Sequence, residues 1–249
     1  MTQLTATAPV RAAGVVGLGS YRPERRVTND ELAPRIDSSD EWIRERSGIV
    51  ERRWAAPDES VADMATIAAT GAVERAGISP EQVGMVLIAT VTHPYQTPSA
   101  AAEVSARIGA RNAAAMDISS ACAGFCYGVN VASDLVRGGS VEYVVVVGVE
   151  KLSDWVNHED RGTAFLFADG AGAVVIGPSD VPAIGPVVWG ADGDQRPDDE
   201  GRHPRARAKR ATRRRCSRAS GQSAISEPAM KTKPATQSRL TSGLTSTLK

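Results

Sequence analysis

Hydrophobic residues in the first 190 positions form short continuous runs separated by stretches with helical spacing. Continuous runs of small and β-branched apolar residues predict buried strands. These runs cover residues 12–19, 84–91, 113–118, 142–149, 170–176 and 184–189, with a short extended piece over 49–54. The four consecutive valines at 144–147 are typical of a strand in a sheet that is covered on both faces.

Apolar positions three and four residues apart predict helices between these strands. The predicted helices are a short one after the capping-box residues Thr28 and Glu31, followed by 38–47, 60–76, 98–108 and 122–136. Strands that alternate with helices predict an α/β fold, with a mostly parallel sheet and helices on both of its faces.

The composition changes abruptly near Gln195. Residues 196–249 hold 14 basic and four acidic residues, so this segment carries a net charge of +10 and residues 1–195 carry −10. Because the segment has few large apolar residues, we expect a disordered basic tail over 196–249. Residues 1–11 are expected to be a flexible N-terminus, and the function is expected within residues 12–195.

Other features of the chain point to a reducing compartment. No apolar run approaches the roughly 18 residues of a membrane helix, and the first residues lack the basic and apolar regions of a secretory signal. Three cysteines in 249 residues do not make a disulfide framework. We therefore expect a cytoplasmic protein.

Cys122 is the best candidate for chemistry. It follows the predicted strand 113–118 and the turn Ser119–Ala121, at the start of a largely apolar helix. Free N–H groups and the partial positive charge of a helix N-terminus favour a thiolate, which is the nucleophilic form of cysteine. The alternative from position alone is a buried, inert cysteine. Cys126, one turn later, is expected to pack, because no ligand cluster with zinc spacing accompanies it, and we expect no metal.

The glycines at 14, 17 and 19 raise the alternative of a dinucleotide-binding loop. Their spacing differs from the required pattern, and Pro23 blocks a helix immediately after them. We reject that function.

Five motifs in order carry a resemblance to a known family. They are Asp40-Glu41-Trp42-Ile43, Arg46-Ser47-Gly48-Ile49, Ser120-Ala121-Cys122-Ala123-Gly124-Phe125, Asp160-Arg161-Gly162-Thr163 and Phe167-Ala168-Asp169-Gly170-Ala171-Gly172-Ala173. Over residues 12–195 the chain resembles the N-terminal half of β-ketoacyl-acyl carrier protein synthase III. The resemblance implies a thiolase-like fold, of which residues 12–195 are the first half, and commonly a homodimer.

The resemblance also implies an activity and a site. Members of this family transfer an acyl group from acyl-CoA to the cysteine and then condense it with malonyl-acyl carrier protein to start fatty-acid chains. Cys122 matches the nucleophile, Trp42 and Arg161 match the pair that sandwiches the CoA adenine, and Arg46 matches a basic residue near the CoA phosphates. Thr97 matches a residue that enters the partner subunit's acyl pocket, where a threonine would leave room for a longer or branched primer. Acyl-CoA is a substrate, and no separate cofactor is implied.

The sequence departs from the family after Gln195. The family completes its catalytic set with a histidine and an asparagine in His-Gln-Ala-Asn-like and His-Gly-Asn-like stretches, and neither stretch occurs here. His93, His158 and His203 lie in other contexts. The Arg-, Ser- and Thr-rich segment that follows resembles out-of-frame translation of GC-rich coding sequence. We therefore expect a truncated, catalytically impaired chain that does not complete the condensation.

Three alternatives stay open at this point. One is a non-catalytic acyl-CoA-binding protein or dimer partner, which would keep Trp42, Arg46 and Arg161 without the histidine and asparagine. Another is a polyketide starter condensing enzyme, which shares the cysteine and the fold. Non-specific nucleic-acid binding by the basic tail is the third, and we regard it as incidental because the tail lacks aromatic residues.

Overall fold

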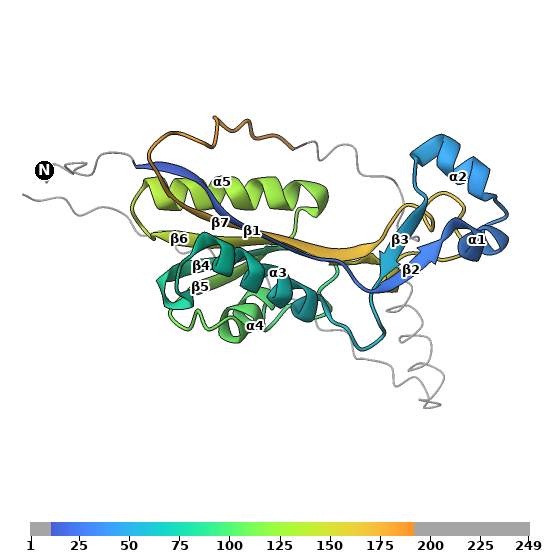
Figure 1. The fold of residues 1–249 in the computed structure, drawn as a ribbon, viewed down its shortest axis with the longest axis horizontal. Helices are drawn as coiled ribbons and strands as arrows, with labels where there is room; N and C mark the ends of the chain where they lie inside the picture. The colour runs from blue at the N-terminus through green and yellow to red at the C-terminus, as the bar shows by residue number, and fades with distance from the viewer. Residues whose placement is uncertain (1–10, 192–249) are drawn as a thin grey trace, which may run out of the picture. The chain divides into compact units, whose positions relative to one another are not determined.

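The computed structural model describes residues 11–191, and a five-stranded sheet runs through this part of the chain (Figure 1). The strand order is β1-β7-β6-β4-β5, and the strands span Ala12–Tyr21 (β1), Asp169–Ser179 (β7), Tyr143–Lys151 (β6), Val83–Ala89 (β4) and Ala114–Ile118 (β5). Strand β4 pairs in parallel with both β5 and β6, whereas β7 pairs antiparallel with β6 and β1. The sheet is therefore mixed, with two parallel and two antiparallel strand pairs, and not mostly parallel as expected, because β7 returns antiparallel between β6 and β1.

Helices cover both faces of this sheet. Helices α3 (Val61–Ala76) and α4 (Ala100–Arg107) lie on one face, and α5 (Gly124–Arg137) lies on the other (Figure 1). Each face has its own buried core, one built from α3 and α4 and the other from α5. Short 3-10 turns η2 (Pro80–Gln82) and η4 (Leu152–Asp154) lie in the connections.

The glycines of β1 allow α3 to cross the strand at close range. A Cβ at Gly19 would lie 1.9 Å from the Ala68 carbonyl oxygen, and one at Gly17 would lie 2.2 Å from the Ala72 carbonyl oxygen. These glycines therefore serve backbone packing between a strand and a helix, which explains their presence without a dinucleotide.

A small lobe carries the first two helices beside the main sheet. Strands β2 (Arg25–Thr28) and β3 (Glu51–Trp54) form an antiparallel pair, and α1 (Asn29–Leu32), η1 (Ala33–Arg35) and α2 (Asp40–Ser47) connect them. Val27, Leu32, Ile36 and Ile43 pack with Trp54, Ala164 and Phe165 in a third core. The sequence pattern does not predict β2, because three of its four residues are exposed and only Val27 is buried.

Most predicted elements form within a few residues of their expected ends, but one strand prediction is wrong. Residues 184–189 are irregular. Pro186 cannot donate to a strand ladder, and the segment instead passes by α5, where the Tyr127 hydroxyl donates to the Gly190 carbonyl at 2.8 Å and the Tyr127 and Trp189 rings lie 5.0 Å apart.

The predicted flexible N-terminus and basic tail lie outside the described residues, apart from Arg11. Within residues 11–191, none of the helices is both long and apolar enough to span a bilayer.

Candidate active site

Cys122 lies on a sharp turn between a strand and a helix. The chain leaves β5 at Ile118 and enters the 3-10 turn η3 (Ala121–Ala123), which leads directly into α5. Ala121 has a φ of 45°, a left-handed conformation that is uncommon for alanine. Such conformations gather at functional sites, where the surrounding structure holds them in place.

The start of this helix leaves its N–H groups without a side-chain cap. Neither η3 nor α5 has a side-chain hydrogen bond at its N-cap, in contrast to Ser39 and Ser60, which cap α2 and α3. The Cys122 side chain is exposed within the described residues. The turn therefore presents an accessible sulfur beside uncapped donors.

An apolar cavity of about 500 Å³ opens beside Cys122. It lies at the carboxyl ends of β4 and β6 and at the start of β7, which is where ligands bind in open α/β sheets. The lining residues are mostly apolar or glycine: Ala89, Val91, Ala121, Phe125, Gly148, Val149, Leu152, Phe167, Ala168, Gly170, Ala171 and Gly172, together with Cys122 and Glu150. The size and lining suit a small, largely apolar ligand group beside the sulfur.

Glu150 is the charged residue in this lining, and sequence reasoning missed it. Its carboxylate accepts hydrogen bonds from the Val91 N–H at 3.0 Å and from the Thr92 hydroxyl at 2.5 Å. The Thr90 hydroxyl donates to the same carboxylate at 3.3 Å. Glu150 thus joins the end of β6 to the loop that follows β4. A lone glutamate ending a valine-rich strand was the available signal.

Trp42, Arg46 and Arg161 meet on the small lobe. The guanidinium carbon of Arg46 lies 4.6 Å from the Trp42 ring centroid, and that of Arg161 lies 4.8 Å from it. Both distances are within the range of cation–π attraction. Phe165 supports the indole edge-to-face, with ring centroids 5.5 Å apart. The fold therefore places the side chain of Arg161, from the loop before β7, against Trp42 on α2.

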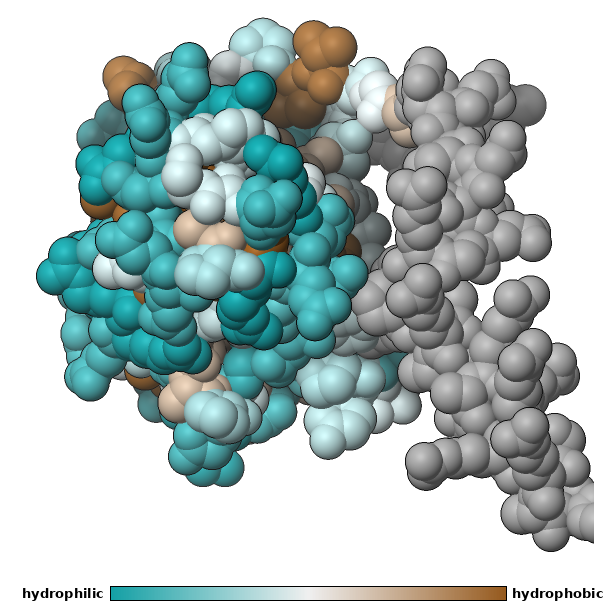
Figure 2. All heavy atoms as spheres, turned by 90° about the vertical axis from the view of Figure 1, so that its right-hand side faces the viewer, coloured by the Kyte–Doolittle hydropathy of each residue, from teal (hydrophilic) through white to brown (hydrophobic). Residues whose placement is uncertain are grey.

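Local sequence signals place Trp42 and Arg46 on α2. The Ser39 hydroxyl accepts from the Trp42 N–H at 3.1 Å, and Gly48 ends the helix with a φ of 72°. Hydrogen bonds from Arg44 and Asn29 hold the pKa of the Asp40 carboxyl below its usual value. Figure 2 looks onto the end of the molecule that carries α1 and α2, and the described residues there are predominantly hydrophilic. This face suits the polar end of a ligand.

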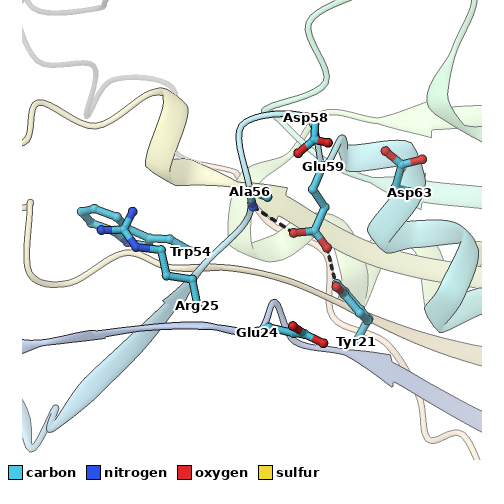
Figure 3. Close-up of a pocket in the computed structure, with 8 residues that line it drawn as sticks. All are labelled: Tyr21, Glu24, Arg25, Trp54, Ala56, Asp58, Glu59 and Asp63. Carbon is cyan, nitrogen blue, oxygen red and sulfur yellow. Dashed lines mark hydrogen bonds between the residues drawn. The ribbon is translucent and has the colours of Figure 1, made fainter.

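A larger cavity of about 710 Å³ contains none of the predicted site residues (Figure 3). Its lining includes Tyr21, Arg25, Trp54 and four carboxylates. The Tyr21 hydroxyl donates to Glu59, which raises the Tyr21 pKa to about 12, and Glu59 also accepts from the Ala56 N–H at 3.0 Å. These contacts, both drawn in Figure 3, fix the turn before α3. Within residues 11–191, no three His, Cys, Asp or Glu side chains are arranged so that they could hold a metal ion together.

The remaining candidates lie apart from the cavity at Cys122. Thr97 is exposed in the loop before α4 and is not among the lining residues. Cys126 is exposed and not packed, because this side of α5 is not covered by the described residues. Neither His93 nor His158 lines the cavity, and a ring nitrogen of His158 instead lies 2.8 Å from the Ser153 carbonyl oxygen.

Comparisons with known proteins match part of this chain to one family. The family model described as 3-oxoacyl-[acyl-carrier-protein] synthase III matches residues 116–193. The β-ketoacyl-[acyl-carrier-protein] synthase III 1 of Streptomyces coelicolor is 55% identical over 183 residues, which are 74% of this chain and 53% of that protein. The mycobacterial β-ketoacyl-[acyl-carrier-protein] synthase III of Mycobacterium avium is 51% identical over 195 residues, 78% of this chain and 58% of that protein. The chain spans little more than half the length of these curated relatives.

Solved structures agree with the sequence matches. The priming β-ketosynthase of a polyketide biosynthetic pathway superimposes with a TM-score of 0.73 and 41% identity, over 83% of this chain and 66% of that one. The 3-oxoacyl-(acyl carrier protein) synthase III of Pseudomonas aeruginosa has a TM-score of 0.68 and 41% identity, over 74% of this chain and 57% of that one. On sequence and on fold, the described part of this chain matches the thiolase-like β-ketoacyl-[acyl-carrier-protein] synthase III family.

Proposed function

We propose that this protein takes an acyl group from acyl-CoA onto Cys122, the first half-reaction of β-ketoacyl-acyl carrier protein synthase III chemistry. The observation that supports this most directly is the position of Cys122. It lies on a left-handed turn at the start of α5, exposed, at the wall of an apolar cavity of about 500 Å³. In the proposed step the Cys122 sulfur attacks the thioester carbonyl, and the carbon–sulfur bond to CoA breaks. The proton lost by the Cys122 thiol ends on the CoA thiol.

The helix start supplies the electrostatics for this step. In the proposed step, the N–H groups at the start of η3, which no side chain caps, face the negative charge that forms at the reacting sulfur and carbonyl. A bond from the same donors to the developing carbonyl oxyanion would lower the barrier. Transfer from sulfur to sulfur balances without a metal or redox cofactor, so we propose acyl-CoA as a substrate and no further cofactor.

We propose that Trp42, Arg46 and Arg161 bind the nucleotide end of acyl-CoA. A purine between the indole and the Arg161 guanidinium needs about 7 Å, two contact distances of ~3.5 Å. Arg161 lies 4.8 Å from the indole centroid, so it must swing away when the base enters. Arg46, on the same helix as Trp42, would face the phosphates.

The second half-reaction is condensation of the acyl group with malonyl-acyl carrier protein. Loss of carbon dioxide leaves an enolate that needs preorganised donors, each worth a few kcal/mol. The resemblance assigns these to a histidine and an asparagine, and no histidine of residues 11–191 lines the cavity. We therefore propose that this chain acylates Cys122 but does not complete the condensation by itself.

We also propose the type of primer, the oligomeric state and the cellular compartment of this protein. Thr97 in place of a bulky residue would favour a longer or branched primer. The outer strand β5 has one open edge among the described residues, which suits pairing with a second copy in a homodimer. Exposed thiols at Cys122 and Cys126 suit the reducing cytoplasm. The polyketide starter enzyme is a second candidate, favoured by the priming β-ketosynthase structure.

Intact-mass measurement after incubation with acetyl-CoA and isobutyryl-CoA tests the proposal. We expect one acyl adduct on the native chain and on Cys126→Ala, and none on Cys122→Ala. Adding malonyl-acyl carrier protein should release no β-ketoacyl product. Binding of acyl-CoA without any adduct would favour the non-catalytic binding protein instead, and a β-ketoacyl product at ordinary rates would refute the proposed block in condensation.

A further inference from the structure

The buried side-chain amide of Asn29, the first residue of α1 in the small lobe, contacts both ends of α2. The Asn29 side chain is 1% exposed and follows β2 directly. Its Nδ2 donates to the Asp40 carboxylate at 2.7 Å and to the Ile49 carbonyl oxygen at 2.7 Å. Asp40 is the first residue of α2, and Ile49 follows the glycine that ends it. One side chain therefore ties the two ends of the helix to the same point.

Arg52 holds this amide in its orientation. The Arg52 residue is 5% exposed on β3, and its Nη2 donates to Asn29 Oδ1 at 2.7 Å while its Nη1 donates to the Val27 carbonyl at 3.2 Å. Because the guanidinium only donates, it fixes Oδ1 toward β3 and both amide hydrogens toward α2. A buried arginine without a carboxylate partner is costly, and its Nε has no hydrogen-bond partner in the structure. The core packing of the lobe alone does not call for such a group.

The helix that this pair holds carries Trp42 and Arg46. Arg161 approaches Trp42 from the loop before β7, so the Trp42–Arg161 geometry depends on where α2 lies. Resting on the proposed CoA site, we propose that Asn29 and Arg52 are positioning residues that set the register of α2 and thereby shape the nucleotide site. They act through the helix, and neither is assigned a contact with the ligand.

Asn29→Asp provides the sharpest change. It keeps the size and the acceptor for Arg52 but removes both donors and places a carboxylate against Asp40. We expect the Kd for coenzyme A, measured by calorimetry on the full chain, to rise about tenfold. The rate of Cys122 alkylation by iodoacetamide, a reagent without a nucleotide, should stay within twofold. If Asn29 only stabilised the fold, the substitution would change both the Kd for coenzyme A and the Cys122 alkylation rate, or neither of them.

Three further variants separate the causes. Arg44→Gln removes an exposed partner of the same Asp40 without touching Asn29, and should bind coenzyme A like the native chain. In the double variant Asn29→Asp with Asp40→Asn, the new asparagine can donate to the new aspartate, which restores the bond between the two positions with its direction reversed. The bond to the Ile49 carbonyl is not restored, so the double variant should recover only part of the affinity for coenzyme A. Asp40→Ala removes one of the two hydrogen bonds that Asn29 donates, and it replaces Asn29→Asp as the test if that variant does not fold. We expect the Kd for coenzyme A of Asp40→Ala to rise about threefold.

A ligand-free readout distinguishes this inference from the proposed function. In chain labelled with 5-fluorotryptophan, Trp42→Phe assigns the Trp42 fluorine resonance among the four tryptophans. We expect Asn29→Asp and Asp40→Ala to shift that resonance and leave those of Trp155 and Trp189 in place. If native chain fails to bind coenzyme A, the proposed CoA site is wrong and the resonance alone decides the positioning role. If native chain binds, and both variants bind equally well with an unmoved Trp42 signal, the positioning role is overturned.

Discussion

Glu150 shows how one polar side chain can shape an otherwise apolar pocket. Its carboxylate accepts hydrogen bonds from the Val91 N–H and from the hydroxyls of Thr90 and Thr92, three residues that directly follow β4. These bonds attach the start of the loop that leads toward Thr97 to β6, the strand that carries Glu150. The cavity beside Cys122 thus owes part of its shape to charge-assisted hydrogen bonds rather than to packing alone.

Glu150→Gln should therefore cost stability. The glutamine amide would set an N–H group against donors that now meet an oxygen, and leaving such groups unpaired costs about 2 kcal/mol. We expect this decrease in the free energy of unfolding by urea titration at pH 7. Glu142→Gln, an exposed change just before β6, is the control and should shift stability little. Equal stability of both variants would show that the Glu150 contacts are not stabilising.

At the scale of elements, the crossing of α3 over β1 depends on the absence of a side chain at Gly19. Gly19→Ala would place a Cβ 1.9 Å from the Ala68 carbonyl oxygen, so strand and helix must separate. Overpacking of this kind costs about 3 kcal/mol, and we expect that loss in urea unfolding. Gly172→Ala on neighbouring β7 is the control, because nothing lies within 4 Å of the added carbon. A Gly19→Ala protein as stable as Gly172→Ala would contradict this packing.

The N-terminus of α3 carries the clearest pH dependence. The Ser60 hydroxyl donates to the Asp63 carboxylate at 2.6 Å, and Arg107 on α4 donates to it at 2.6 Å. Led by the Ser60 bond, these contacts lower the Asp63 pKa to about 2. Because the folded pKa lies below the unfolded value of about 3.9, the stabilisation is present above that value and is lost as the pH falls toward 2.

Asp63→Asn should accordingly destabilise the protein by about 1 kcal/mol at pH 7, a value reduced for the partial exposure of the carboxylate. The difference from native protein should shrink steadily between pH 4.5 and pH 2.5 in urea titrations. Asp58→Asn, a nearby exposed change, should show no such trend. A difference that stays constant over this pH range would argue against the assigned pKa.

At the scale of the whole molecule, the sequence predicts elements well where local signals and burial agree. Ser39, Ser60 and Gly77 mark helix ends because capping and left-handed glycine are local effects. The buried strands can be predicted because helices cover both faces of the sheet, so the strand residues form continuous apolar runs. Two segments differ from the sequence prediction: β2 forms through its pairing with β3, whereas residues 184–189 are largely apolar but join no sheet.

The candidate site follows the same division. Cys122 is visible from its place between a strand and a helix. Residues 42 and 161 are far apart in the chain, and only the motif resemblance links them before the fold brings their side chains together. Glu150, Asn29 and Arg52 have no sequence signature of a site, because their roles come from tertiary hydrogen bonds.

The central claim is that the sulfur of Cys122 and the Trp42 site serve the two ends of one acyl-CoA molecule. The most direct test compares rates of Cys122 acylation by acetyl-CoA and by the acetyl thioester of N-acetylcysteamine, which lacks the nucleotide, in native chain and in Trp42→Ala. We predict that native chain prefers acetyl-CoA by about tenfold or more and that Trp42→Ala loses most of this preference while keeping its rate with the short thioester. Equal rates with both thioesters in native chain, or a preference that survives in Trp42→Ala, would contradict the account.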